Sequence, residues 1–279
     1  MKPWMILIVI GLLLGSVIIA FQERAAFTKT EAQGASVAMN IKLTPVVVEL
    51  FTSEGCSSCP PADDVLARLE KMQPVAGAEI IALGEHVDYW NDLGWADPFS
   101  SADFSARQNE YARAFGQDGV YTPQMVVDGR AEFLGSDLGK ARAAIAAAMQ
   151  NPKAKVTITR AQNAAAAKSH AVALAVRVTD IPSFSADDTI ELLLAVTESS
   201  LHSNVLRGEY SGRKLNHTAV VRQLKVISST TEQSAKTLSA ESTINIETGW
   251  RRENLRAVVF AQEHKSRRVL GAAAVGLEK

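Results

Sequence analysis

Residues 45–61, PVVVELFTSEGCSSCPP, join a run of β-branched residues to two cysteines and two prolines. The apolar run Val46–Phe51 predicts a strand that is buried on both faces. Prolines and aspartates are favoured in the first turn of a helix, so the residues up to Glu70 predict a helix. The cysteine pair is therefore expected at the junction of a buried strand and a helix.

The residues that follow alternate between strand and helix patterns. We expect a strand over 79–84, a helix from Asp103 to about Phe115 and a hairpin whose turn is Asp128-Gly129. An alanine-rich helix over 137–149 ends this part. The order predicts an α/β domain over residues 45–150, with a mixed sheet flanked by helices.

Beyond Asn151-Pro152 the apolar residues recur with period two, as in Leu192, Leu194 and Val196. Residues 151–279 therefore predict a second domain of about seven or eight strands, an all-β antiparallel sandwich.

The N-terminus suggests export. Residues 5–21 form an unbroken apolar run and predict an apolar helix, so residues 1–26 are a signal peptide or an uncleaved signal anchor that engages the membrane. Polar residues 27–44 are expected to be a linker. The rest of the chain would then be periplasmic or secreted, where a dithiol can persist as a disulfide.

Composition excludes other classes. The 279 residues carry a net charge of -1, which argues against nucleic acid as a partner. With only two cysteines, Cys56 and Cys59, no disulfide framework can link distant parts of the chain.

Cys56 and Cys59 are the candidate catalytic residues. At a helix N-terminus Cys56 would favour the thiolate and be the attacking sulfur, reachable from outside, while Cys59 would resolve the mixed disulfide. The carboxylates of Glu54, Asp63 and Asp64 would oppose thiolate formation.

Thr122 and Pro123 are the candidate substrate-positioning residues. After an upstream dithiol we expect the Thr122-Pro123 bond to be cis, with the Thr122 backbone beside Cys56 so that a peptide can pair with it. The alternative is an ordinary proline on an edge strand.

These motifs resemble the thioredoxin superfamily. More closely, the segments 51–61, 86–90, 93–95, 97–99 and 212–217 resemble the secreted bacterial domain-of-unknown-function family numbered 1223. The resemblance implies a thioredoxin-like domain with an appended β domain, and it implies no established reaction. The chain lacks thioredoxin's Trp before the first cysteine and its Gly-Pro between the two.

Residues 86–99 follow a strand end where ligands gather in α/β sheets. Trp90 and Trp95 could form an apolar wall at the site, and His86 or Asp88 could shuttle protons to Cys59. The alternative is a loop held by its own aromatic residues. His202, His217 and His264 show no ligand spacing and are interpreted as surface or core residues.

The sequence therefore predicts an exported thiol-disulfide oxidoreductase-like protein. It would act on thiol- or disulfide-bearing proteins or small thiols, with the Cys56–Cys59 disulfide as its redox group and no other cofactor or metal. Two alternatives remain open. One is a non-catalytic partner-binding protein with a structural disulfide, and the other is a Cu(I) carrier that uses Cys56, Cys59 and His86.

Overall fold

The computed structural model describes residues 43–160 and 170–278. In the first half of the fold, residues 43–150, strand β1 (Thr44–Thr52) lies between two other strands. It pairs in parallel with β2 (Ala78–His86) and antiparallel with β3 (Gln124–Val127). β3 continues through the Asp128-Gly129 turn into β4 (Ala131–Leu134), which confirms the predicted hairpin.

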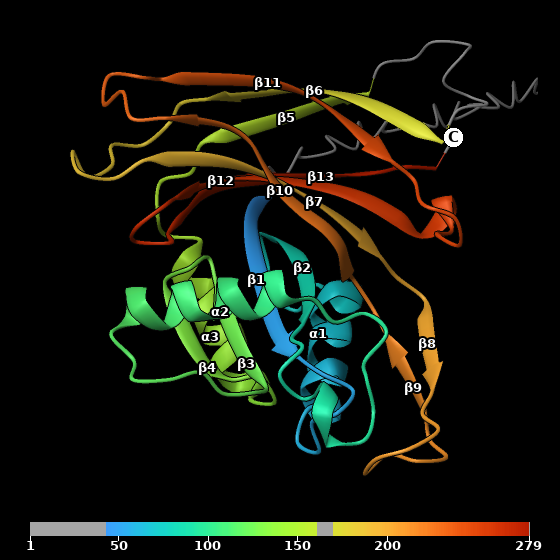
Figure 1. The fold of residues 1–279 in the computed structure, drawn as a ribbon. Coiled ribbons are helices and arrows are strands. Elements are labelled where there is room, and N and C mark those ends of the chain that lie inside the picture. Colours follow the sequence, from blue (N-terminus) through green and yellow to red (C-terminus); the bar gives the residue numbers. More distant parts are fainter. Residues whose placement is uncertain (1–42, 161–169, 279) are drawn as a thin grey trace, which may run out of the picture. The chain divides into compact units, whose positions relative to one another are not determined.

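Three α-helices in the described residues cover this half (Figure 1). They are α1 (Pro60–Met72), α2 (Ala102–Phe115) and α3 (Leu138–Ala148), close to the predicted ranges. Val46, Val48 and Leu50 of β1 pack with α1 and α3, whereas Val47 and Phe51 pack with α2. Helices thus lie on both faces of β1, as its continuous apolar run predicts.

The second half supplies nine strands within the described ranges. They are β5 (Lys155–Arg160), β6 (Ala171–Thr179), β7 (Ile190–Glu198), β8 (Leu201–Asn204), β9 (Lys214–His217), β10 (Val220–Thr230), β11 (Thr237–Asn245), β12 (Leu255–Glu263) and β13 (Val269–Gly276). β5, β6 and β11 form a three-stranded sheet that packs over β7 and β12, and β8 pairs only with β9 among the described strands (Figure 1).

The predicted fold class, a thioredoxin-like α/β domain followed by a sandwich domain, is wrong. Eight strands of both halves form one mixed sheet in the order β13-β12-β7-β10-β2-β1-β3-β4. The halves meet where Val220 of β10 lies opposite Gly84 of β2, in parallel orientation. Among the described residues more lie in strands than in helices, and the described residues lie in one compact unit.

The physical reason lies in β7 and β12, which are buried on both faces. Leu192 and Leu194 of β7 pack under the three-stranded sheet, while Leu193 and Ala195 join the cluster that contains Phe51 and α2. A strand of a freestanding sandwich would expose the second face, so these strands belong to a sheet with layers on both sides.

Residues 1–42 lie outside the described residues. They contain the predicted apolar helix over 5–21, the predicted signal peptide or anchor over 1–26, and the predicted linker from residue 27 as far as residue 42. Within the part of the chain that the structure describes, no helix is long and apolar enough to cross a membrane.

Candidate functional site

The two cysteines form a disulfide between β1 and α1. Its sulfur atoms are 2.08 Å apart and its Cα atoms 5.4 Å apart. The chain turns tightly here, because Cys56 N–H donates to the Ser53 carbonyl and Cys59 N–H donates to the Cys56 carbonyl. Helix α1 begins at Pro60 with Cys59 as its N-cap, so Cys56 lies one turn before the helix rather than at its first residue.

Both cysteines are 0% exposed, so the expectation of a reachable sulfur is wrong for this structure. The loop between β8 and β9 covers the turn, with the Tyr210 hydroxyl donating to the Ser57 carbonyl. Trp90 packs against Gly55, because a Cβ on Gly55 would lie 3.0 Å from the Trp90 Cβ. Only the side chains of Ser57 and Ser58 are exposed in the tetrapeptide.

Thr122 and Pro123 lie beside the disulfide, and their peptide bond is cis, as predicted. The Thr122 hydroxyl donates to Cys56 Sγ at 3.4 Å. Trp90 Nε1–H donates to the same hydroxyl oxygen at 2.9 Å, and Ser58 Oγ lies 3.5 Å from the Thr122 carbonyl oxygen. The sequence predicts that the Thr122 backbone lies beside Cys56 to pair with a peptide. In the structure the Thr122 side chain makes the contact with the sulfur.

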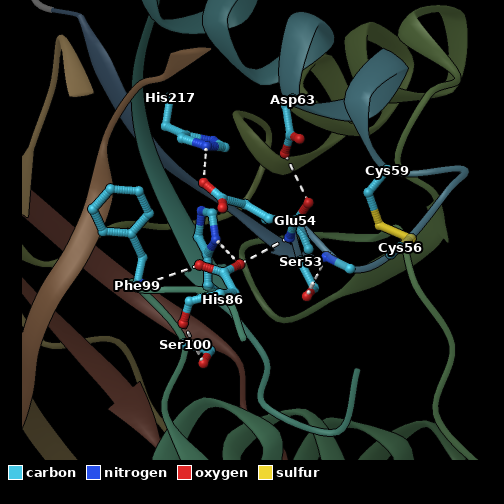
Figure 2. A network of polar contacts seen from close by, with 12 residues as sticks. Ser53, Glu54, Cys56, Cys59, Asp63, His86, Phe99, Ser100 and His217 are labelled. Atoms are coloured by element: carbon cyan, nitrogen blue, oxygen red, sulfur yellow. Dashed lines mark hydrogen bonds and ion pairs between the residues drawn. A yellow bond between two sulfur atoms is a disulfide. The ribbon is translucent and has the colours of Figure 1, made fainter. Parts of the chain in front are cut away.

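Two histidine–carboxylate pairs lie next to the disulfide (Figure 2). His86 Nδ1 is 2.7 Å from Asp97 Oδ2, and His217 Nε2 is 2.8 Å from Glu54 Oε1. The imidazole rings meet edge to face with centroids 4.9 Å apart. All four residues are buried.

The two pairs are bonded into one network. Glu54 N–H donates to Asp97 Oδ2 at 2.8 Å, and Trp95 Nε1–H donates to Glu54 Oε2 at 2.7 Å. Burial disfavours both charges of the His86–Asp97 pair, but each partner stabilises the other, so the pKa of His86 is raised and the pKa of Asp97 is lowered. Both shifts favour the charged form of the pair.

Asp63 is a third acid at the site. It lies four residues after Cys59 on α1 and accepts a hydrogen bond from the Thr52 hydroxyl at 2.8 Å. Burial, opposed by the charges of His86 and His217, raises the pKa of Asp63 to about 6. This carboxyl can therefore exchange a proton near neutral pH.

The predicted site residues divide into two groups. Glu54, His86, Trp90 and Trp95 lie at the disulfide or in its network. Asp88 does not, because its carboxylate accepts from Ser105 Oγ of α2 at 2.6 Å and its own N–H donates to the same oxygen at 3.1 Å. The proton shuttle through Asp88 has no support in this geometry.

Sequence reasoning missed Asp97, His217 and Tyr210 as parts of the site. Asp97 and His217 were in the segments that carried the family resemblance, but no spacing rule links His217 to Glu54, 163 residues earlier. Tyr210 gave no signal.

The donor set does not form a metal centre. Within residues 43–160 and 170–278, no group of three or more His, Cys, Asp and Glu side chains is placed to hold a metal ion. The two sulfurs that a Cu(I) carrier would use are bonded to each other, and His86 Nδ1 is taken by Asp97.

Comparisons with known proteins show the fold and the family of the chain. The crystal structure of an Agrobacterium tumefaciens protein from the Northeast Structural Genomics Consortium matches with a TM-score of 0.63 and 23% identity, over 85% of this chain and 96% of that chain. At this identity the likeness shows the fold alone.

A second structure is the alkylpurine DNA glycosylase AlkC of Pseudomonas fluorescens bound to DNA containing an abasic site analog. Its TM-score is 0.23 and its identity 12%, over 50% of this chain and 35% of that chain, too low to support an argument. No curated protein matches the chain significantly.

The family model described as "Protein of unknown function (DUF1223)" matches residues 47–262. These residues include the disulfide, Thr122-Pro123 and both histidine–carboxylate pairs. The chain therefore belongs to this family.

Proposed function

We propose that the protein is an exported thiol-disulfide exchange protein in which Cys56 attacks and Cys59 resolves. The observation that carries the proposal is the position of the Cys56–Cys59 disulfide, which is the only pair of cysteines in the chain and has the Thr122 hydroxyl 3.4 Å from Cys56 Sγ. A disulfide stabilises a fold more when it closes a longer loop, and this one closes a turn of only four residues, so it contributes little as a structural crosslink.

The proposed exchange needs only the two sulfurs and a partner disulfide. In the reduced protein the Cys56 thiolate bonds to one partner sulfur, the partner S–S bond breaks and one partner thiolate leaves. Cys59, after losing its proton, bonds to Cys56 Sγ and displaces the second partner thiolate. The protein loses two electrons and the partner gains them, and the reverse sequence oxidises a partner dithiol.

Asp63 is the proposed proton acceptor for Cys59. It follows Cys59, the N-cap of α1, by about one helical turn, and its pKa of about 6 lets it hold or release a proton near neutral pH. The His86–Asp97 pair is buried nearby, and the charge of His86 limits how far burial raises the pKa of Asp63.

The N-terminal sequence supports the exported location in this proposal. The apolar run over residues 5–21 is typical of a signal peptide or a membrane anchor, and an oxidising compartment allows the disulfide to persist. The proposed partner is a thiol- or disulfide-bearing protein in that compartment.

Mixed-disulfide trapping tests the proposal. The full-length Cys59→Ala variant, expressed in bacterial cells and quenched with an alkylating agent, should accumulate adducts through Cys56 that dissolve on reduction. The variant that lacks both cysteines is the control and should form none. A correctly folded Cys59→Ala protein without adducts in cells, and without an adduct to oxidised glutathione in vitro, would contradict exchange.

A second candidate is a partner-binding protein in which the disulfide only stabilises the turn. The 0% exposure of both cysteines favours this alternative, because attack requires a sulfur to become accessible. Equilibration with glutathione redox buffers separates the two functions. A reduction potential below about −300 mV would indicate a structural disulfide, and a higher one an exchange site.

A further inference from the structure

We infer that the Thr122 hydroxyl, held in its donor orientation by Trp90, is the group that stabilises the Cys56 thiolate. This inference rests on the proposed exchange function and assigns a catalytic role to a side chain whose sequence-based role was backbone presentation. Trp90 becomes a positioning residue rather than a substrate wall.

The first step of the argument is that helix α1 offers few donors to a thiolate. Pro60 and Pro61 occupy its first two positions and carry no N–H. The next two N–H groups, of Ala62 and Asp63, both donate to the Cys59 carbonyl, at 2.8 and 3.1 Å. Helix α1 therefore offers few free N–H groups to the Cys56 thiolate. A donor that stabilises it would lie outside the helix.

The second step is the direction of the hydrogen bonds. An indole N–H can only donate, so Trp90 Nε1, 2.9 Å from Thr122 Oγ1, engages a lone pair of that oxygen. The hydroxyl donates to Cys56 Sγ at 3.4 Å. The Tyr89 hydroxyl, which donates to Gln108, is the other group within reach of Thr122 and stays neutral because its pKa is raised. Trp90 is itself fixed by close contact with Gly55, where an added Cβ would lie 3.1 Å from the Trp90 carbonyl oxygen.

The third step is that this bond discriminates between redox states. A disulfide sulfur is a weak acceptor, whereas a thiolate receives a charge-assisted hydrogen bond about twice as strong as a neutral one. The bond therefore stabilises the reduced protein more than the oxidised protein. Its loss should raise the pKa of Cys56 and shift the redox equilibrium toward the disulfide.

The surrounding charged groups are already engaged elsewhere. The Glu54 carboxylate bonds to Trp95 and His217, the Asp63 carboxylate accepts from Thr52, and the Tyr210 hydroxyl donates to the Ser57 carbonyl. A neutral hydroxyl lowers the energy of the thiolate beside these carboxylates without adding charge. Ser58 Oγ, 3.5 Å from Cys56 Sγ and equally far from the Thr122 carbonyl oxygen, is exposed and is the natural comparison residue.

The test measures the pKa of Cys56 in the reduced full-length protein, from the pH dependence of iodoacetamide alkylation located by mass spectrometry. Thr122→Val keeps the shape and removes the hydroxyl, and it should lower the thiolate fraction about tenfold at pH values below the pKa. Thr122→Ser should restore the wild-type value. Trp90→Phe should shift it in the same direction as Thr122→Val but less, and Ser58→Ala should leave it within about twofold.

Equal pKa values of Cys56 in wild type and a folded Thr122→Val protein would overturn the inference and leave the exchange function intact. If Thr122→Val does not fold, Trp90→Phe decides, and an unchanged pKa there overturns the inference. The converse result, a shifted pKa with no adducts in the trapping experiment, would support the hydroxyl's role and contradict the exchange function.

Discussion

Asp63 is a partly buried acid whose raised pKa makes the stability of the protein depend on pH. Its pKa is 3.8 in an unperturbed chain and about 6 in the folded protein, chiefly because of burial. Between about pH 4 and pH 6 the folded protein keeps a proton that the unfolded chain has released, so this residue lowers stability as the pH rises. A proton acceptor at this position thus costs stability at neutral pH.

Replacing Asp63 by Asn should remove this cost. Asn keeps an oxygen for the Thr52 hydroxyl, so the two proteins should be similarly stable at pH 4, while the variant should gain up to about 3 kcal/mol relative to wild type by pH 7. Denaturant unfolding of the oxidised proteins from pH 4 to 7 measures the difference. The exposed neighbour Asp64→Asn is the control, and parallel pH curves for wild type and Asp63→Asn would contradict the assignment.

At the same scale, the sequence could predict only the residues placed by a local motif or by the order of the elements. Cys56 and Cys59 lie between a strand and a helix, which is a local pattern. Thr122-Pro123 lies 66 residues after Cys56, and its place beside the dithiol was predictable only from the order of the strands and helices. The cover could not be predicted, because Tyr210 reaches Ser57 across 153 residues. Exposure of a sulfur depends on such distant contacts.

Among the secondary-structure elements, β1, β2 and α2 share a buried charged cluster. Arg107 of α2 donates from Nε to Glu49 Oε2 at 2.7 Å, and the Tyr111 hydroxyl donates to Glu49 Oε1. Glu85 of β2 lies 3.4 Å from Arg107 Nε but accepts no hydrogen bond within the described residues, and as a neutral acid it could only donate its proton to Glu49. Burial, with the Glu49 charge second, holds the pKa of Glu85 well above its usual range.

The two acids should therefore respond oppositely to removal of charge. Glu49→Gln breaks a bonded buried ion pair and should destabilise the protein by about 3 kcal/mol or more. Glu85→Gln removes a carboxyl group that burial disfavours when charged, and it should leave stability unchanged or increase it, increasingly so as the pH rises. Guanidinium unfolding at pH 7 and 8 compares them. A larger loss for Glu85→Gln than for Glu49→Gln would show that Arg107 depends on Glu85 instead.

Element types and turns were predictable here because each is a local pattern. Gly116 ends α2 in a left-handed conformation, and the Asp128-Gly129 turn closes β3 and β4, both as the sequence indicated. The period-two pattern of β7 predicts a single buried face that carries Leu192, Leu194 and Val196. This prediction is wrong, because Leu193 and Ala195 between them are buried as well.

At the scale of the whole molecule, the continuous sheet joins the halves that the sequence separated. Beyond the pairing of β10 with β2, the hairpin turn of the first half contacts the β12–β13 connection of the second, where Val269 N–H donates to the Asp128 carbonyl at 2.9 Å. Strand pairing between distant segments leaves no periodic signal in the chain. We therefore expect the two halves to unfold together.

Gly129 tests that coupling because its α-carbon lies against the second half. An added Cβ would lie 1.8 Å from the Arg267 carbonyl oxygen, and the residue has φ +62. Gly116 has nearly the same backbone, φ +67, with nothing within 4 Å of such a Cβ. Gly116→Ala should cost about 1 kcal/mol from backbone strain, and Gly129→Ala should cost about 1–3 kcal/mol more because the junction must move apart.

Hydrogen exchange measures which strands lose protection in the Gly129→Ala variant. If the sheet is one cooperative unit, amides of β1 and β2 and amides of β7 and β12 should lose protection by the same free energy, because all of them exchange through the same global opening. Gly116→Ala should lower protection uniformly by its smaller amount. Protection lost only in β3, β4 and the β12–β13 connection, with β1 and β7 unaffected, would mean that the two halves open independently despite their shared sheet.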